Sequence, residues 1–233
     1  MVLHELINGI IGHQCARYCS NPWAIHELVV KRIARYLLKT KDKGLAHCPT
    51  GLLALDMYIN EDFVGWWHKE YAELRYSVLS RTGYVIMFCG CHITWCSKLQ
   101  LEIALSMTEC EYIALSTATR ELLPLRCILT DVHTHTFIDL HSNKSPDTVK
   151  TLNLPPSKIF EDNNACIILA TTETHFKPRT KHISLKFHHF HDQVCQGFIE
   201  VIKINTNENL ADIFTKPLSR IKFQYLHGLL LGW

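Results

Sequence analysis

Acidic and amide side chains occur at four separated places where they could act on one ligand. They are a strand end at 60–62, a helical segment at 111, a second strand end at 162 and a helix start near 212. Strand ends and the helices beside them converge on one edge of an α/β sheet, which is where ligands commonly bind. Carboxylate oxygens gathered there could hold a metal ion. The residues in question are Asn60, Glu61, Asp62, Glu111, Asp162 and Asp212.

Taken one at a time, these acids also have structural explanations. Ser106 followed by Glu109 fits a capping box, which assigns Glu109 to the helix start. Glu111 lies about 200° further around the same helix, so the two carboxylates do not aim at one site. Asp162, between a strand and a helix, fits a helix cap. Asp212 falls in or near the first turn of a terminal helix, where a carboxylate is favoured by the helix dipole.

The elements that would position these residues are indicated by apolar spacing. Residues 20–45 predict a helix with a Ser or Asn cap, Pro22 in its first turn and Gly44 beyond its end, and residues 3–19 predict a shorter helix before it. Branched and aromatic runs then predict a three-stranded meander. The three runs are LLALDMYI (52–59), GYVIMFCG (83–90) and HITWCSK (92–98).

The second half of the chain alternates between regular elements and polar segments. Helical spacing follows Ser106, and residues 131–157 carry Ser, Asn, Asp and Pro, which predicts a long loop. SKIFEDNNACIILA (157–170) predicts a strand that leads into a helix. The end of the chain predicts a strand, a polar turn and a terminal helix, which together give an α/β fold.

Composition limits the class of protein. The 233 residues are 47% hydrophobic with a formal net charge of +2, which suits one globular domain with a short appendage and no strong global field for nucleic acid. No signal-peptide pattern and no apolar run of about 20 residues is present, so we expect a soluble intracellular protein without a membrane partner. Ten Cys form no C-x-x-C pair, which argues against a zinc module.

Apart from the short KTKDKG segment at 39–44, residues 175–194 form the densest basic tract. The simpler interpretation of this tract is a solvated helix face, but it could also contact a phosphate backbone. Its candidate nucleic-acid contacts are Lys177, Arg179, Lys181 and His182.

Several of these segments together resemble the C-terminal part of copia-type retrotransposon Pol polyproteins, the ribonuclease H domain that follows the reverse transcriptase. The resemblance extends from about residue 12 to residue 218 and is weakest in the 131–157 loop. Residues 1–50 are similar to the end of the reverse transcriptase region, and residues 51–233 to the ribonuclease H domain. The segments that carry it are SRTGYVIMFCGCHITWCSKLQLEIALSMTECEYIALSTATRE, EDNNACIILA, RTKHISLKFHHFHDQV and NENLADIFTKPL.

The resemblance implies a ribonuclease H-like fold, with a mixed five-stranded sheet flanked by helices and an N-terminal helical pair. It implies cleavage of the RNA strand of RNA/DNA hybrids, with two Mg²⁺ ions that Mn²⁺ can replace. It also implies the reverse transcriptase region as a partner and a cytoplasmic location, in virus-like particles or with access to the nucleus. The family's acids fall on Asn60, Glu111, Asp162 and Asp212, of which the last three would be the metal ligands.

The first of these positions departs from the family pattern. Related sequences have Asp-Ala-Asp where this chain has Asn60-Glu61-Asp62, so the leading acid is an amide. Loss of one unit charge about 4 Å from a cation costs about 4 kcal/mol at an effective dielectric near 20, or at least about 10³ in affinity. Asp62 shares a face with Asn60, but it lies about 6 to 7 Å further along the strand, so it substitutes only through a bulge.

Two hypotheses follow for function. The chain is either a magnesium-dependent ribonuclease H, or a mobile-element remnant that has lost catalysis and holds nucleic acid weakly. Asn60 and the absence of a preceding polymerase favour the remnant. Retention of Glu111, Asp162 and Asp212 favours the enzyme.

Overall fold

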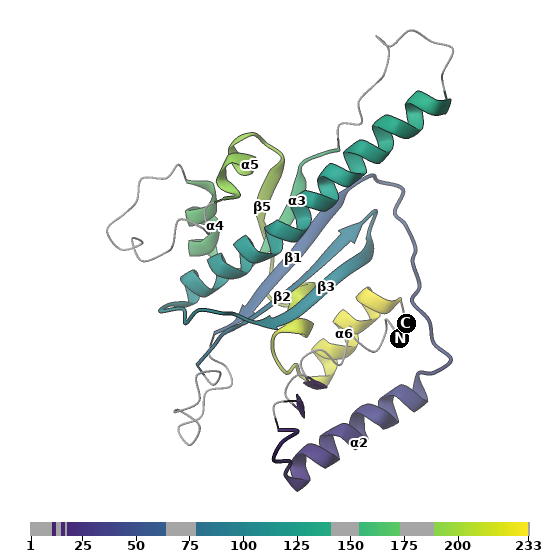
Figure 1. Ribbon diagram of the computed structural model, residues 1–233, viewed down its shortest axis with the longest axis vertical. Coiled ribbons are helices and arrows are strands. Elements are labelled where there is room, and N and C mark those ends of the chain that lie inside the picture. The colour runs from purple at the N-terminus through teal and green to yellow at the C-terminus, as the bar shows by residue number, and fades with distance from the viewer. Residues whose placement is uncertain are drawn as a thin grey trace.

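Alternating apolar residues build a mixed sheet of five strands in the computed structural model of the chain (Figure 1). The structure describes residues 11–12, 15–16, 18–63, 78–140, 154–172 and 189–232, with side chains of 133–140 left out. The strands are β1 (Leu55–Asp62), β2 (Arg81–Phe88), β3 (Cys91–Leu99), β4 (Ser157–Glu161) and β5 (Ile199–Lys203). The helices are α2 (Ala24–Lys39), α3 (Met107–Leu140), α4 (Asn164–Thr171), α5 (His191–Cys195), the 3-10 helix η6 (Leu210–Phe214) and α6 (Arg220–Leu231).

The strand order is β3-β2-β1-β4-β5. β1, β2 and β3 pair antiparallel, so the predicted meander is confirmed. β4 pairs parallel to β1, and β5 pairs parallel to β4. The predicted mixed five-stranded α/β sheet is therefore confirmed, and the carboxyl ends of β1, β4 and β5 lie at one edge.

Helices cover both faces of the sheet, because side chains alternate along each strand. Leu55, Met57 and Ile59 of β1 join the buried core that includes residues of α3. Val85 and Met87 of β2 join a second core formed with η6 and α6. Figure 1 shows α3 crossing the sheet, and it shows α6 beside the β2 and β3 strands near the C-terminus.

The start of α3 confirms the capping prediction, with one change. Ser106 Oγ accepts a hydrogen bond from the Glu109 backbone N–H at 3.1 Å, while Glu109 Oε2 accepts from the Leu105 N–H at 2.7 Å rather than from Ser106. The predicted loop at 131–157 is wrong over its first part, because α3 continues to Leu140. Residues 131–140 contain no Gly or Pro to end a helix.

The predicted N-terminal helix exists, but its cap is different. Trp23 is the N-cap of α2, and its backbone N–H donates to His26 Nδ1 at 2.9 Å. Tyr36 Oη lies 3.0 Å from His227 Nε2, which links α2 to α6. Within 3–19, residues 11, 12, 15 and 16 are helical, and most of the rest lies outside the described residues. The division at residue 50 stays a prediction.

None of the helices in the described part of the chain is both long enough and apolar enough to cross a bilayer.

Candidate metal centre

Strand alternation directs the last residue of β4 toward α3. Ser157, Ile159 and Glu161 are fully buried, whereas Lys158 between them is exposed. Phe160 points to the other face, where its ring stacks on Tyr58 at 4.5 Å. Glu161 therefore occupies a core-facing position that an apolar residue would ordinarily fill.

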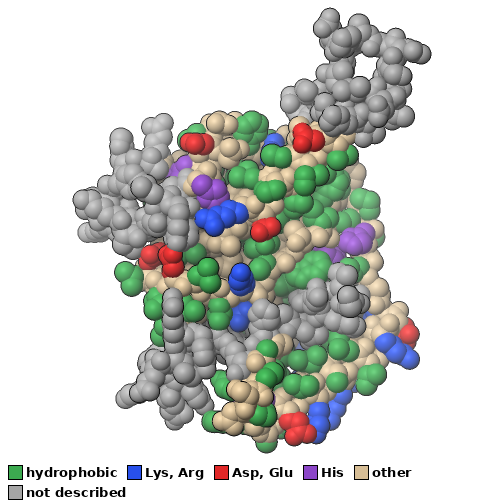
Figure 2. Space-filling view, in the orientation of Figure 1, with side chains coloured by type: hydrophobic (Ala, Val, Ile, Leu, Met, Phe, Trp, Pro, Cys, Tyr) green, Lys and Arg blue, Asp and Glu red, His purple; other side chains and the backbone are tan. Residues whose placement is uncertain are grey.

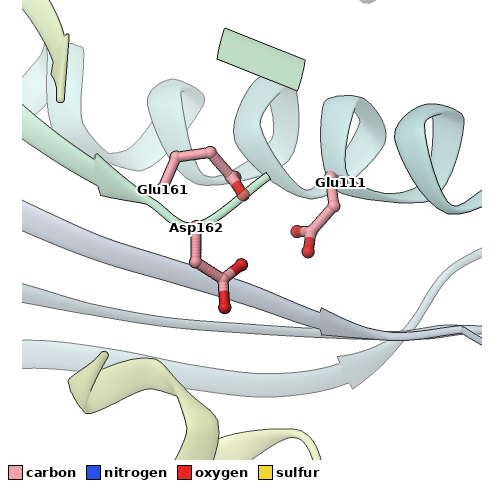
Figure 3. Close-up of side chains that lie close together, drawn as sticks. All are labelled: Glu111, Glu161 and Asp162. Carbon is pink, nitrogen blue, oxygen red and sulfur yellow. The ribbon is translucent and has the colours of Figure 1, made fainter. Parts of the chain in front are cut away.

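Three carboxylates meet at the carboxyl end of β4. Glu111 of α3, Glu161 of β4 and Asp162 just after β4 each offer an oxygen, and these atoms lie within 4.8 Å of one another (Figure 3). We call these three residues the carboxylate trio. Glu161 is 0% exposed and Glu111 is 5% exposed, while Asp162 is half-buried. The trio is thus closed on the core side and open on the Asp162 side.

Two oxygens of the trio have no hydrogen-bond partner among the described residues. Glu161 Oε1 accepts from the Asn163 N–H at 2.8 Å, which orients the carboxylate and leaves Oε2 unpaired. Glu111 Oε2 is likewise buried and unpaired. Buried polar atoms are normally satisfied, so these two oxygens indicate a ligand or a shared proton.

The electrostatics agree with this geometry. Burial, followed by the charges of Glu161, Glu61 and Asp162, raises the pKa of Glu111 well above its usual value. Burial also raises the pKa of Glu161 to about 8, and the hydrogen bond from the Asn163 backbone only partly offsets it. Like charges in a low-dielectric site disfavour ionisation unless a cation is present.

Glu61 lies on the same side of the sheet as the trio. Its Oε2 accepts a hydrogen bond from Cys110 Sγ at 2.7 Å, and burial raises the pKa of Glu61 to about 7. Burial and nearby acids also raise the pKa values of Cys110 and Cys166. Both cysteines are therefore neutral thiols, so the ionisable donors are oxygens.

An oxygen-only donor set suits a hard divalent cation. Mg²⁺ binds through one or two carboxylates plus waters, and Mn²⁺ accepts the same ligands. The trio provides three carboxylates, two of which carry unpaired buried oxygens. The residues present therefore fit one such cation.

Asn60 faces away from the trio, toward η6. It is 1% exposed, and its Nδ2 donates to Thr215 Oγ1 and, at 3.0 Å, to the Glu61 carbonyl oxygen. Asp62 is the last residue of β1, two positions after Asn60, so alternation puts its side chain on the Asn60 face; burial raises the pKa of Asp62, and Lys216 and Arg81 partly lower it. The predicted shared face of Asn60 and Asp62 is thus confirmed, and neither side chain belongs to the trio.

Asp212 is fully buried in η6 and is neutralised by lysines. Its Oδ1 lies 2.7 Å from Lys216 Nζ, and its Oδ2 contacts Lys222 Nζ. Burial would lower the pKa of Lys216, but the hydrogen bond to Asp212 and the charges of Asp212, Asp162 and Glu111 raise it. The Lys216 charge therefore interacts with Asp212 directly and with Asp162 and Glu111 of the trio through the electric field.

A glycine and an asparagine hold η6 in this place. A Cβ on Gly83 of β2 would lie 2.6 Å from Thr215 Cγ2 and 2.9 Å from Phe214 Cβ, so only glycine permits this approach. Asn209 Oδ1 caps η6 through the Ala211 N–H, and its Nδ2 donates to the Ile59 carbonyl oxygen at 2.7 Å.

Two positional predictions need correction. Asp162 is not the cap of α4, because Asn163 Oδ1 accepts from the N–H groups of Ala165 and Cys166. Asp212 is not in the terminal helix: it lies in η6, and α6 begins only at Arg220. Asp162 is therefore available for another role.

The predicted nucleic-acid contacts Lys177, Arg179, Lys181 and His182 lie outside the described residues, and they stay predictions. Figure 2 shows Lys and Arg side chains scattered over the visible face rather than gathered into one basic patch.

Motif spacing missed Glu161 as a site residue, and it did not place Glu61 on the trio side of the sheet. The signal that finds them is strand alternation: Glu61 follows Met57 and Ile59 at a period of two, and Glu161 follows Ile159. A carboxylate on the buried face of a strand is rare unless it is paired, which marks both residues for attention.

Sequence comparison gives three long matches. The retrovirus-related Pol polyprotein from transposon RE2 of Arabidopsis thaliana is 31% identical over 213 residues, which is 91% of this chain and 13% of that polyprotein. The corresponding polyprotein from transposon TNT 1-94 of Nicotiana tabacum is 32% identical over 209 residues, 90% of this chain and 14% of that protein. The polyprotein from transposon RE1 of Arabidopsis thaliana is 30% identical over 213 residues, again 91% of this chain and 13% of that protein.

No family model matches the chain, and no solved structure matches it. The chain spans 13 to 14% of the length of the polyproteins described above. Because all three matches cover about nine-tenths of it, the chain belongs to the retrovirus-related Pol polyproteins of copia-type retrotransposons.

Proposed function

We propose that this retrotransposon-derived chain is a ribonuclease H-like domain whose ancestral reaction is magnesium-dependent cleavage of the RNA strand of RNA/DNA hybrids. We propose further that the reaction is impaired in this copy. The observation that carries the proposal is the carboxylate trio, Glu111, Glu161 and Asp162, with two unpaired buried oxygens at the carboxyl end of β4.

The topology supports a ribonuclease H-like fold. An antiparallel meander, β1 to β3, is extended by β4 and β5, which run parallel to β1. Helix α3 joins the meander to β4 and delivers Glu111 to the sheet edge where β4 ends. This is the mixed five-stranded arrangement that the resemblance implies.

The chain's own residues would hold the cation and orient the substrate. Glu111, Glu161 and Asp162 would be its protein ligands, and Glu161 is held in place by the Asn163 N–H. A bound Mg²⁺ supplies an activated water and offsets phosphate charge. The half-buried Asp162 lies on the open side, where a phosphodiester would approach.

Two sets of contacts support impairment. A second cation would need charge at position 60, where Asn60 instead donates to Thr215 and to the Glu61 carbonyl oxygen. It would also need Asp212, which is engaged by Lys216 and Lys222. These contacts favour the second candidate function, a non-catalytic remnant that binds nucleic acid weakly.

Asn60→Asp tests the impairment. Cleavage of a hybrid with a labelled RNA strand is measured with Mg²⁺ or Mn²⁺ for the unchanged chain and for the variant. We expect Asn60→Asp to raise the cleavage rate by at least about 10², because it returns a negative charge to the family's leading acid position. Equal rates for the two proteins would show that the amide is not the defect.

Controls separate the enzyme from the remnant. In the Asn60→Asp background, Glu111→Gln should lower hybrid cleavage by at least about 10², whereas Glu200→Gln, at an exposed position on β5, should leave it unchanged. Duplex DNA should resist both proteins. If Asn60→Asp does not cut the hybrid either, the enzyme proposal fails and the remnant stands.

The basic tract is the proposed contact with the hybrid backbone. Replacing Lys177, Arg179 and Lys181 together with Ala should weaken hybrid binding. It should also reduce the slope of log affinity against log salt by about one for each phosphate that the variant no longer neutralises. Hybrid affinity that does not depend on salt would contradict this assignment. The reverse transcriptase region of the same polyprotein and a cytoplasmic location remain part of the proposal.

A further inference from the structure

The family pattern does not assign a role to Glu161, because its acids fall on positions 60, 111, 162 and 212. In the structure Glu161 is nevertheless the most buried member of the carboxylate trio and the last residue of β4. Its carboxylate faces Glu111 rather than solvent (Figure 3). A second glutamate placed against a first in the core is unfavourable unless something positive or a proton lies between them.

The two carboxylate oxygens of Glu161 have different surroundings. Oε1 is held by the backbone N–H of Asn163, and Oε2 has no hydrogen-bond partner within the described ranges. The Asn163 bond thus holds the Glu161 carboxylate in place beside Glu111 and Asp162, with one oxygen of each residue within 4.8 Å of the others. Glu111 Oε2 is likewise buried and has no hydrogen-bond partner among the described residues. One oxygen held by the backbone and one unpaired is the arrangement of a preoriented metal ligand.

Asp212 has the opposite arrangement. Both of its oxygens contact lysine ammonium groups, Lys216 and Lys222, so its charge is already neutralised. Asn60 carries no charge and donates its amide hydrogens to Thr215 and the Glu61 carbonyl oxygen. The side chains at two of the four family positions, 60 and 212, are thus already paired with other groups of the chain.

We infer that this chain binds a single divalent cation through Glu111, Glu161 and Asp162, with Glu161 as a ligand in place of the positions at 60 and 212. This inference rests on the proposed function, because the cation is the one that the proposed nuclease would use. It differs from the family expectation of two cations, and it identifies a metal ligand to which the family pattern assigns no role.

The test is a titration of the full chain with Mn²⁺, after bound metal has been removed with EDTA and the EDTA has been removed in turn. Binding is measured as the loss of the paramagnetic resonance signal of free Mn²⁺. We expect one Mn²⁺ per chain and at least about ten-fold weaker binding for Glu161→Gln, because a charged ligand becomes neutral. Glu200→Gln, the matched exposed glutamate, and Asp62→Asn, the predicted substitute, should bind Mn²⁺ as the unchanged chain does.

Thermal unfolding separates loss of a ligand from loss of the fold. Without metal, Glu161→Gln should melt at a higher temperature than the unchanged chain, because Gln is neutral in both states, whereas Glu161 must take up a proton or bury an uncompensated charge when the chain folds. Added Mn²⁺ should raise the melting temperature of the unchanged chain and leave that of Glu161→Gln nearly constant. A variant that merely misfolds would instead melt lower.

Three results would overturn the inference: unchanged Mn²⁺ affinity in Glu161→Gln, two equivalent Mn²⁺ ions per chain, or no Mn²⁺ binding at all. The last would mean that the trio shares protons. Hybrid cleavage is measured separately, so retained Mn²⁺ binding without cleavage by Asn60→Asp would overturn the proposed function and leave this inference standing.

Discussion

The two sides of the sheet treat buried acids in opposite ways. On the α3 side, Glu111 and Glu161 lie together with unpaired oxygens and raised pKa values. On the η6 side, Asp212 is just as buried, but Lys216 and Lys222 neutralise it. The difference shows that burial alone does not mark a metal ligand. What marks one is a buried carboxylate for which the chain supplies no cation.

The largest expected effect is a pH dependence that arises from the α3 side. In EDTA, raised pKa values mean that the folded protein keeps protons that the unfolded chain, with glutamate pKa near 4.5, has released. The free energy of unfolding is therefore highest below about pH 4.5 for these groups, and it falls as pH rises through about 7 to 8. We expect a loss on the order of 3 kcal/mol between pH 5.5 and 8.5.

Urea unfolding at several pH values, with and without Mn²⁺, measures this slope. Mn²⁺ should flatten it, since the cation replaces the bound protons. Stability that rises across this range in EDTA would contradict the assignment. The titratable groups on this side are Glu61, Cys110, Glu111, Glu161, Asp162 and Cys166, and the charges of Asp62 and Lys216, from the η6 side, also act on them.

The next largest effect is expected when the negative charge of Asp212 on the η6 side is removed. Asp212→Asn leaves Lys216 and Lys222 without their anion, and it should lower the free energy of unfolding by about 2 kcal/mol, less than for a fully buried pair because both lysines are partly exposed. The free energy of unfolding is measured in urea for Asp212→Asn and for a control variant, Asp192→Asn, which changes an exposed acid at the start of α5. If both variants lose equally little stability, Asp212 is not held by its lysines as described.

The smallest effect tests the link between the two sides. Lys216 pairs with Asp212 and also feels the charges of Asp162 and Glu111. Lys216→Gln removes a positive charge that repels a cation in the trio, so Mn²⁺ affinity should rise about five-fold, or about 1 kcal/mol. Titration with Mn²⁺ at low salt measures it. Weaker Mn²⁺ binding would show that Lys216 supports the site instead of opposing it.

Much of the fold could be predicted from local pattern. The meander, the strand-to-helix unit at 157–170 and the capping role of Glu109 follow from alternation, turn residues and short-range hydrogen bonds. The wrong predictions concern helix boundaries and helix caps. Residues 131–140 are polar enough to suggest a loop, but they contain no helix breaker, and α3 extends through them.

The site is only partly predictable, for a different reason. Glu111 and Asp162 are candidates from the sequence, and the structure brings them together. Motif spacing misses Glu161 because the Asp beside it fits the family pattern, although Ile159 and Glu161 share one face of β4 by simple alternation. The effect of Lys216 on the trio cannot be predicted from sequence spacing. Its position four residues after Asp212 predicts an ion pair with Asp212, but it does not predict an interaction with Asp162.

The sequence by itself determined which residues are acidic, which strands alternate and which family the chain belongs to. Only the tertiary structure decided that Glu161 joins Glu111 and Asp162, while Asn60 turns toward Thr215 and Asp212 toward its lysines. The physical reason is that strand and helix periods fix the direction of a side chain relative to its own element. Which charges then face one another depends on packing between elements far apart in the chain.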